Sequence, residues 1–292
     1  MSARLLDGKM VARELLDRLR PRIVAFKRQR GRAPALAIVS IGLDHASHLY
    51  ARKKLEACRR VDISAQLCTP SGKLSEPAVL RWLDRLAKNP RVDAILIESP
   101  LPKPLDFNTL VRRLPAAKDV EGLSDANFGR LFSAKNWEEI KNAKMLVPAT
   151  AQAVLALILK SRIGLRGANA VVVGRSSIIG RPVAHLLSAC DATVTLCHSR
   201  TRDLRRHLRQ ADIVVSAVGR PGFIHGRDLK RGAVVVDVGI NYRAEKICGD
   251  VDFKSAERIA AWITPVPGGV GPVTTAYLLS NAVLCAEKRY AR

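Results

Sequence analysis

The segment from Val171 to Pro182 combines residue types that suit phosphate binding. Three valines typical of a buried strand lead into Gly174, and Gly180 opens a predicted helix. A strand, a glycine turn and a helix start direct amide donors and the positive end of a helix dipole to one point. The spacing differs from G-x-G-x-x-G, so two interpretations stay open at this stage: a phosphate site, or a tight turn without a ligand.

The residues after the next predicted strand indicate which dinucleotide would bind. In NAD-binding domains of the Rossmann type, that strand ends near an Asp or Glu that binds the ribose 2′-hydroxyl. Here the strand at 192–197 is followed by His198, Ser199 and Arg200, without an acid. Arg175 and Arg200 suit the 2′-phosphate of NADP. The chemistry therefore favours NADP over NAD, and the alternative for Arg200 is a solvated surface arginine.

Two further segments have little side-chain bulk. Residues 215–222 end a predicted strand with Gly219 and Gly222, and residues 265–272 contain three glycines and three prolines. Small residues allow a flat ring to approach the backbone closely. The alternative for both segments is a simple turn.

The elements that would position these residues alternate between strands and helices. We predict strands at 36–41, 65–68, 94–97, 170–173, 192–197, 213–217 and 233–238, and helices at 7–29, 46–60, 76–88, 150–160 and 273–288. Continuous β-branched runs such as Val234–Val236 suit strands buried on both faces of a parallel sheet. Pro100, Pro102 and Pro104 interrupt the pattern and predict a functional loop at the carboxyl end of a strand. Residues 118–147 show no regular pattern and are predicted to be irregular.

The fold class that follows is α/β, with two α/β domains. We expect the first domain to comprise residues 1–147 plus 273–292, because the last helix can return to it after the glycine-proline loop. We expect the second, at 148–272, to be a Rossmann-like NADP-binding domain.

Length and composition exclude several classes of protein. The chain has 292 residues, of which 48% are hydrophobic and 26% charged, so it is neither disordered nor fibrous. Its uncharged apolar stretches are far shorter than the roughly 20 residues of a membrane span, and the first residues lack a signal-peptide pattern. Six cysteines without a C-x-x-C pair predict a reduced, cytoplasmic protein. No metal site is predicted, because the histidines form no ligand pattern.

The charge balance is unusual. The chain has 49 Lys+Arg against 26 Asp+Glu, a formal net charge of +23. Nucleic acid is disfavoured as a partner, because aromatic residues make up only 4% of the chain and no basic run contains stacking residues. A phosphorylated cofactor or a polyanionic substrate would gain from the positive field. The plain alternative is a set of solvated, arginine-rich helix faces.

Eight segments, spread over nearly the whole chain, match one known pattern. They are Tyr50-x-x-x-Lys54 and the segments at 99–102, 118–122, 174–182, 197–201, 237–241, 249–253 and 264–272. In this order they resemble the methylenetetrahydrofolate dehydrogenase/cyclohydrolase family. The resemblance implies oxidation of 5,10-methylenetetrahydrofolate by NADP, hydrolysis of the methenyl product to 10-formyltetrahydrofolate, and a place in one-carbon metabolism and purine biosynthesis. It also implies a substrate cleft between the domains, a homodimer, and folates that can carry polyglutamate tails.

The resemblance assigns roles to individual residues. Lys54 would handle protons around the attacking water, assisted by Tyr50 and Glu98 as the other catalytic residues. A spacing of four on a helix puts Tyr50 and Lys54 on one face, although such a pair can also simply cover apolar surface. The substrate-binding residues implied are Glu121, Pro100, Gly268, Gly269 and Pro272. The NADP-binding residues implied are Gly174, Arg175, Ser176, Ile179, Gly180, Ser199, Arg200, Gly219 and Ile240.

Two of the departures from the family pattern bear on the chemistry. Glu98 stands where the family has a glutamine, and we expect it to face Lys54. A carboxylate favours the charged ammonium, a poorer base, so we expect weakened cyclohydrolase activity with the dehydrogenase less affected; a protonated Glu98 would instead mimic the amide. Glu121 replaces an aspartate that binds the pterin ring, and its extra methylene moves the carboxylate by about 1 Å, a misplacement that can cost roughly a hundredfold in rate. The alternative interpretation is a non-catalytic or altered-specificity paralogue that binds nucleotide or folate.

Overall fold

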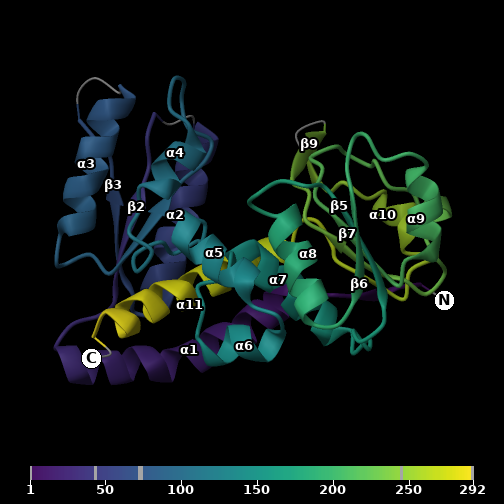
Figure 1. Ribbon diagram of the computed structural model, residues 1–292, viewed down its shortest axis with the longest axis horizontal. Helices are drawn as coiled ribbons and strands as arrows, with labels where there is room; N and C mark the ends of the chain where they lie inside the picture. The colour runs from purple at the N-terminus through teal and green to yellow at the C-terminus, as the bar shows by residue number, and fades with distance from the viewer. Residues whose placement is uncertain (1, 43–44, 72–74, 244–245, 291–292) are drawn as a thin grey trace. The chain divides into compact units, whose positions relative to one another are not determined.

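The computed structural model describes residues 2–42, 45–71, 75–243 and 246–290, and it confirms the predicted α/β class with parallel sheets (Figure 1). The chain forms two compact units. We call them the three-stranded unit (Leu15–Ser133, Lys144–Val147 and Leu278–Arg292) and the six-stranded unit (Met1–Glu14, Ala134–Ala143 and Pro148–Tyr277). The domain limits expected from the sequence stay a prediction; the first residues group with the six-stranded unit because a short N-terminal strand joins its sheet.

The three-stranded unit is built on a parallel sheet of order β3-β2-β4. Its strands are β2 (Ala35–Val39), β3 (Ser64–Cys68) and β4 (Ala94–Ile97), and the helices between them are α2 (His45–Arg60) and α3 (Glu76–Lys88). Every residue of β4 is buried, although β4 is an outer strand in this order. After β4 the chain returns beside this strand, where Ile95 and Asp119 form a parallel bridge. The end of β4 and the residues after Asp119 therefore lie at one edge of the sheet.

Three short helices lie in segments for which the sequence showed no periodicity. They are α4 (Phe107–Arg112), α5 (Asp125–Ser133) and α6 (Trp137–Asn142). The prediction that 118–147 is irregular is therefore wrong for α5 and α6. Side-chain caps begin α4 and α6: Asp106 accepts from Thr109 N at 2.7 Å, and Asn136 accepts from Glu139 N at 2.9 Å.

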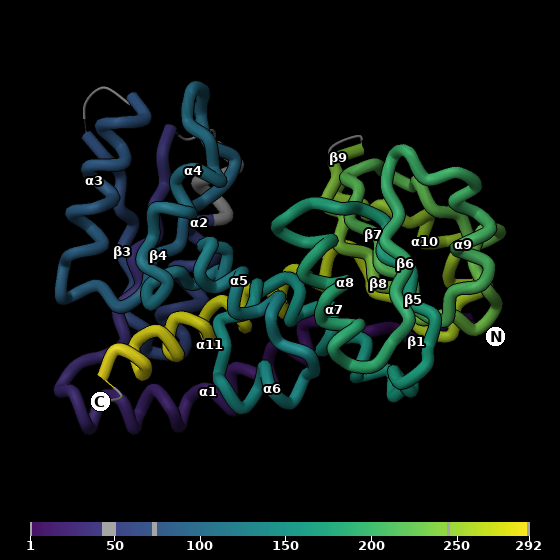
Figure 2. Tube along the Cα trace, viewed as in Figure 1, coloured from purple at the N-terminus to yellow at the C-terminus, as the bar shows by residue number. Residues whose placement is uncertain are grey.

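Two long helices begin in one unit and end in the other along the chain. They are α1 (Gly8–Arg30) and α11 (Val270–Tyr290). Within the three-stranded unit the later part of α1 runs beside the end of α11 (Figure 2). There Arg22 binds the Glu287 carboxylate through two nitrogens, at 3.0 and 2.7 Å. Among the described residues, no helix combines the length and the hydropathy that a bilayer crossing requires.

The six-stranded unit has a parallel sheet of order β1-β11-β8-β7-β5-β6. Its strands are β1 (Arg4–Leu5), β5 (Asn169–Val173), β6 (Thr193–Cys197), β7 (Ile213–Ser216), β8 (Val234–Asp237) and β11 (Trp262–Ile263). Its other elements are α7 (Ala149–Lys160), α8 (Gly180–Ala189), α9 (Leu204–Gln210), η1 (Gly226–Asp228), α10 (Phe253–Ala256) and the antiparallel pair β9 (Asn241–Arg243) and β10 (Lys246–Cys248). β6 pairs with one edge of β5 and β7 pairs with the other edge, so the direction in which strands are added reverses at β5. Such a switch point is where open α/β sheets bind ligands, at the carboxyl ends of the strands.

Candidate active and cofactor sites

Lys54 is positioned by the buried face of α2. Ala51 lies three residues before it and Cys58 four residues after it, and both are fully buried. Because residues three and four apart share a helix face, Lys54 is on the side of α2 that packs inwards. Its side chain is 23% exposed. The ammonium therefore has restricted access to solvent and needs a partner within the unit.

That partner is Glu98, as the sequence predicted. Lys54 Nζ donates to both carboxylate oxygens of Glu98 at 2.7 Å. Glu98 directly follows β4, and its amide donates to Val39 O at 2.9 Å, which continues the pairing of the sheet to this residue. Its side chain is 8% exposed. A carboxylate in such surroundings requires a hydrogen-bonded cation, and Lys54 supplies it.

Glu121 is presented by the segment that lies beside β4. Ile95 N donates to Lys118 O at 2.7 Å, and Val120 N donates to Ile95 O at 3.3 Å. Buried Asp119 fixes the segment from the other side, because it accepts from Ser124 N at 2.7 Å and Asn127 Nδ2 at 2.9 Å. The Glu121 side chain therefore projects from a backbone segment that is fixed by hydrogen bonds before and after it.

The Glu121 carboxyl belongs to the same electrostatic cluster as Lys54. Loss of hydration is the largest cause that raises its pKa from 4.5 to about 8; the negative charges of Asp119 and Glu98 act in the same direction, and the Lys54 ammonium opposes them. Near neutral pH, Glu121 thus holds a proton, whereas Glu98 is in an ion pair.

Two further predicted residues belong to this unit. Tyr50 is on α2, four residues before Lys54, and its side chain lies outside the part of the chain that the structure describes. Pro100 is exposed, two residues after Glu98. The unit thus brings together Lys54, Glu98 and Glu121, and Pro100 follows Glu98 closely in the chain.

The predicted glycine turn joins β5 to α8 in the six-stranded unit. Gly174 has a φ of +123°, and a Cβ at this position would lie 2.3 Å from Ala217 O. A Cβ on Gly180 would lie 1.9 Å from Gly174 O. Ser176 Oγ closes the turn by accepting from Ile179 N at 3.1 Å and Gly180 N at 3.3 Å. Positions 174 and 180 therefore have no room for a side chain, so the backbone there is uncovered beside the N-terminus of α8, an arrangement that fits a diphosphate.

The residues that follow β5 and β6 include exposed cations and polar groups. Arg175, Ser199 and Arg200 are all exposed. The backbone after β6 is fixed by local bonds: His198 N donates to Thr201 Oγ1 at 2.8 Å, and Arg200 N donates to His198 Nδ1 at 3.1 Å. The first acid in the chain after β6 is Asp203, which caps α9 by accepting from Arg206 N at 3.3 Å. These features fit a 2′-phosphate better than a free 2′-hydroxyl.

The remaining predicted residues also belong to the six-stranded unit. Gly219 follows β7, and Ile240 follows β8 with 54% of its surface exposed. The loop before α11 is held by Gly8, whose amide donates to Gly268 O at 3.0 Å. Gly269 is buried, and Pro272 is partly buried in the first turn of α11. The structure therefore divides the predicted substrate-binding residues between the two units.

Comparison with known proteins agrees with this geometry. The family model described as the tetrahydrofolate dehydrogenase/cyclohydrolase catalytic domain matches residues 6–121, and its NAD(P)-binding domain matches residues 148–290. The Bifunctional protein FolD of Moorella thermoacetica is 44% identical over 289 residues, covering 99% of this chain and 100% of the relative. This chain belongs to the tetrahydrofolate dehydrogenase/cyclohydrolase family.

Solved structures of family members have the same fold. The enzyme of Campylobacter jejuni, a methylenetetrahydrofolate dehydrogenase/cyclohydrolase, superposes with a TM-score of 0.92 at 34% identity, covering 99% of this chain and 100% of that one. The Trypanosoma brucei enzyme, solved as a complex with NADP and an inhibitor, gives 0.91 at 34% identity, with full coverage of both chains. The family fold is thus present from end to end.

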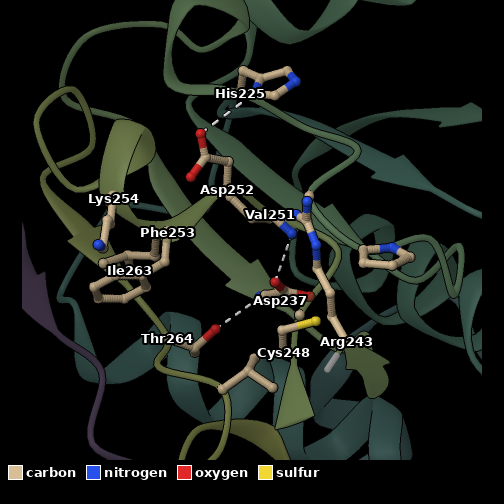
Figure 3. A pocket seen from close by; sticks show the side chains of 14 residues that line it. His225, Asp237, Arg243, Cys248, Val251, Asp252, Phe253, Lys254, Ile263 and Thr264 are labelled. Carbon is tan, nitrogen blue, oxygen red and sulfur yellow. Dashed lines mark hydrogen bonds and ion pairs between the residues drawn. The ribbon is translucent and has the colours of Figure 1, made fainter. Parts of the chain in front are cut away.

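Two buried carboxylates of this family member were not predicted as site residues. Asp237 ends β8 and Asp250 follows β10, and they are 3% and 0% exposed. Burial is the largest cause that raises the pKa of Asp237 to about 6. Figure 3 shows Asp237 between Val251 and Thr264, beside a cavity of about 420 Å³. None of the predicted site residues lines this cavity. Among the described residues, no cluster of three or more potential metal ligands occurs.

Proposed function

We propose that this protein is a bifunctional folate enzyme. It oxidises 5,10-methylenetetrahydrofolate with NADP to 5,10-methenyltetrahydrofolate, and it hydrolyses that product to 10-formyltetrahydrofolate. The main support is that the models of both family domains match this chain. The chain also has the Lys54–Glu98 pair and the glycine turn after β5. The bifunctional relatives match the chain over its whole length, so a non-catalytic paralogue is not favoured.

The dehydrogenase step depends mainly on binding and orientation. When bound, NADP supplies the hydride acceptor. Gly174, Ser176, Ile179 and Gly180 would hold its diphosphate, and Arg175, Ser199 and Arg200 its 2′-phosphate. Gly219 and Ile240 would contact the part of the cofactor that reacts. The folate nitrogens stabilise the cation that forms, so positioning of the two reactants accounts for most of the catalysis.

The hydrolysis step requires proton transfers, and in this chain the lysine proposed to carry them is paired with a carboxylate. Water adds to the methenyl carbon and loses both of its protons as the formyl C=O forms; one proton ends on the ring nitrogen whose bond to that carbon breaks, and the other is released to solvent. The Lys54 ammonium can donate to the nitrogen that leaves, and Tyr50 would assist it. Lys54 becomes a base only after it gives a proton away, and both Glu98 oxygens stabilise the ammonium. We therefore propose a hydrolysis that is slower than oxidation.

A product analysis tests the function. The purified protein is given 5,10-methylenetetrahydrofolate with NADP or with NAD, and methenyl and 10-formyl products are followed against an enzyme-free control. We expect methenyl product with NADP, a lower rate with NAD, and hydrolysis that is clearly above the control rate but slower than the oxidation. No methenyl product with either cofactor would refute the dehydrogenase, and hydrolysis at the control rate would refute the cyclohydrolase.

The finer parts of this function are also proposals. The protein acts in the cytoplasm as a homodimer and supplies one-carbon units for purine biosynthesis; six free cysteines support a reducing compartment. Glu121, Pro100, Gly268, Gly269 and Pro272 bind the folate. The net charge of +23 supports a preference for folates with polyglutamate tails. Sedimentation velocity tests the dimer. A comparison of KM for mono- and pentaglutamylated substrate at two salt concentrations tests the preference, which added salt is expected to weaken.

A further inference from the structure

One carboxylate accepts hydrogen bonds from two separate segments of the six-stranded unit. Asp250 is fully buried. Its Oδ2 accepts from Val218 N at 2.7 Å, Gly219 N at 3.3 Å and Ser216 Oγ at 3.2 Å, and its Oδ1 accepts from Arg220 N at 2.9 Å and Asn241 Nδ2 at 2.9 Å. Three consecutive amides of the loop after β7 thus point at one anion. Hydrogen bonds to a charged acceptor are stronger than neutral ones, so this loop is fixed by Asp250 rather than by a strand pairing.

A second carboxylate holds the first one in place. Asp237 Oδ1 accepts from Asp250 N at 3.0 Å and from Gly239 N at 2.9 Å, and its Oδ2 accepts from Val251 N at 2.8 Å. The backbone packs directly onto these anions. A Cβ on Gly249 would lie 1.9 Å from Asp237 Oδ2, and a Cβ on Gly239 would lie 2.2 Å from Asp250 Oδ1. Both glycines are therefore needed for the close approach.

The two loops that are fixed in this way contain two of the residues assigned above to NADP. Gly219 is the middle residue of the loop after β7, and Ile240 lies between Gly239 and Asn241 in the loop after β8. The Asp250 carboxylate contacts both loops, one through Val218–Arg220 and the other through the Asn241 side chain. We propose that Asp250, aligned by Asp237, is a positioning residue that fixes these two loops for the nicotinamide half of the cofactor. This inference rests on the proposed function.

An asparagine at position 250 should fail in this role although it has nearly the same shape. Each oxygen of Asp250 accepts at least two bonds, so either orientation of an amide places its NH₂ group against N–H donors. At least one backbone amide would then lose its acceptor, and leaving a buried donor without a partner is unfavourable. The loop amides should open more readily, while the three-stranded unit with Lys54 is unchanged.

The test compares Asp250→Asn with Asp252→Asn, the same substitution two residues further on. Asp252 is partly exposed and contacts His225 rather than either loop. Three quantities are measured in each: hydrogen exchange of the amides at 218–220 without cofactor, the Kd for NADP by calorimetry, and cyclohydrolase activity without NADP. For Asp250→Asn we expect exchange at 218–220 faster by roughly tenfold or more, a Kd raised by a similar factor, and cyclohydrolase activity within about twofold of wild type. Asp252→Asn should match wild type in all three.

Wild-type exchange at 218–220 and wild-type NADP affinity in a folded Asp250→Asn protein would overturn the proposal. If Asp250→Asn does not fold, Ser216→Ala tests the proposal instead. Ser216 is fully buried, and this substitution removes one hydrogen-bond donor to Asp250. We expect the same changes at smaller size, and their absence in Ser216→Ala would overturn the proposal as well. Failure of the proposed function is distinguishable, because it would be seen in the wild-type protein as no NADP binding or no methenyl product.

Discussion

The proposed sites of the two units differ in whether side chains or backbone groups form them. The proposed site of the three-stranded unit consists of ionisable side chains: Lys54, Glu98 and Glu121 come from α2, the end of β4 and the segment beside it. The proposed site of the six-stranded unit consists mainly of backbone, in the Gly174 turn and in the amides that Asp250 binds. The first site is therefore sensitive to a change of one charge. The second is sensitive to one added carbon or one lost acceptor.

Removal of the Lys54 ammonium should have the largest effect, and on one activity only. We expect Lys54→Met to lower cyclohydrolase activity by roughly 10²–10⁴-fold, the range for a positioned acid or base, with dehydrogenase activity within a few-fold. The variant leaves Glu98 buried and unpaired, which destabilises a protein by about 3–5 kcal/mol. The double variant Lys54→Met/Glu98→Gln removes this charge and serves as the folded control. Hydrolysis at the wild-type rate in the double variant would show that Lys54 is not the proton-handling residue.

One added carbon in the glycine turn should weaken NADP binding and leave the cyclohydrolase activity unchanged. In Gly174→Ala the new Cβ would meet Ala217 O at 2.3 Å, so the turn must move. We expect roughly a tenfold or greater loss of NADP affinity and unchanged cyclohydrolase activity. Gly167→Ala is the matched control, because its φ is also positive at +75° and a Cβ there meets nothing within 4 Å. Equal losses of NADP affinity in both variants would mean that the close contact at Gly174 does not form the cofactor site.

A change of Glu98 tests whether charge limits the side-chain site. Glu98→Gln keeps the shape and one acceptor for Lys54 but removes the anion, so the lysine loses its ion-pair partner and one of its two acceptor oxygens. We expect the enzymatic hydrolysis rate to rise several-fold at neutral pH, with the dehydrogenase rate unchanged. Glu56→Gln, on an exposed part of the same helix, is the control. A lower rate in Glu98→Gln would instead place the carboxylate on the proton pathway.

The contrast between the sites also explains what the sequence could predict. Runs such as Val171–Val173 identified the long strands, and the facing of Lys54 and Glu98 followed from a family pattern. The two-residue strands β1 and β11 are too short for any periodicity, and α5 and α6 are short helices in a segment without it. The role of Asp250 was missed for a different reason: its donors lie 9 to 34 residues away in the chain, and only the folded loops bring them to one carboxylate.

The smallest expected effect is a pH dependence of stability that originates at Glu121. Its pKa in the folded protein, about 8, lies above its ordinary value of 4.5. Between these values the folded state binds a proton that the unfolded state has released, so this group makes stability fall as pH rises through the window. Asp237 acts in the same direction, but its pKa of about 6 confines the effect to lower pH. Between about pH 6.5 and 9 the Tm of wild type should therefore fall more steeply than that of Glu121→Gln. Parallel curves would mean that the Glu121 carboxyl is hydrated, and the electrostatic cluster around Lys54 would then be limited to its ion pair with Glu98.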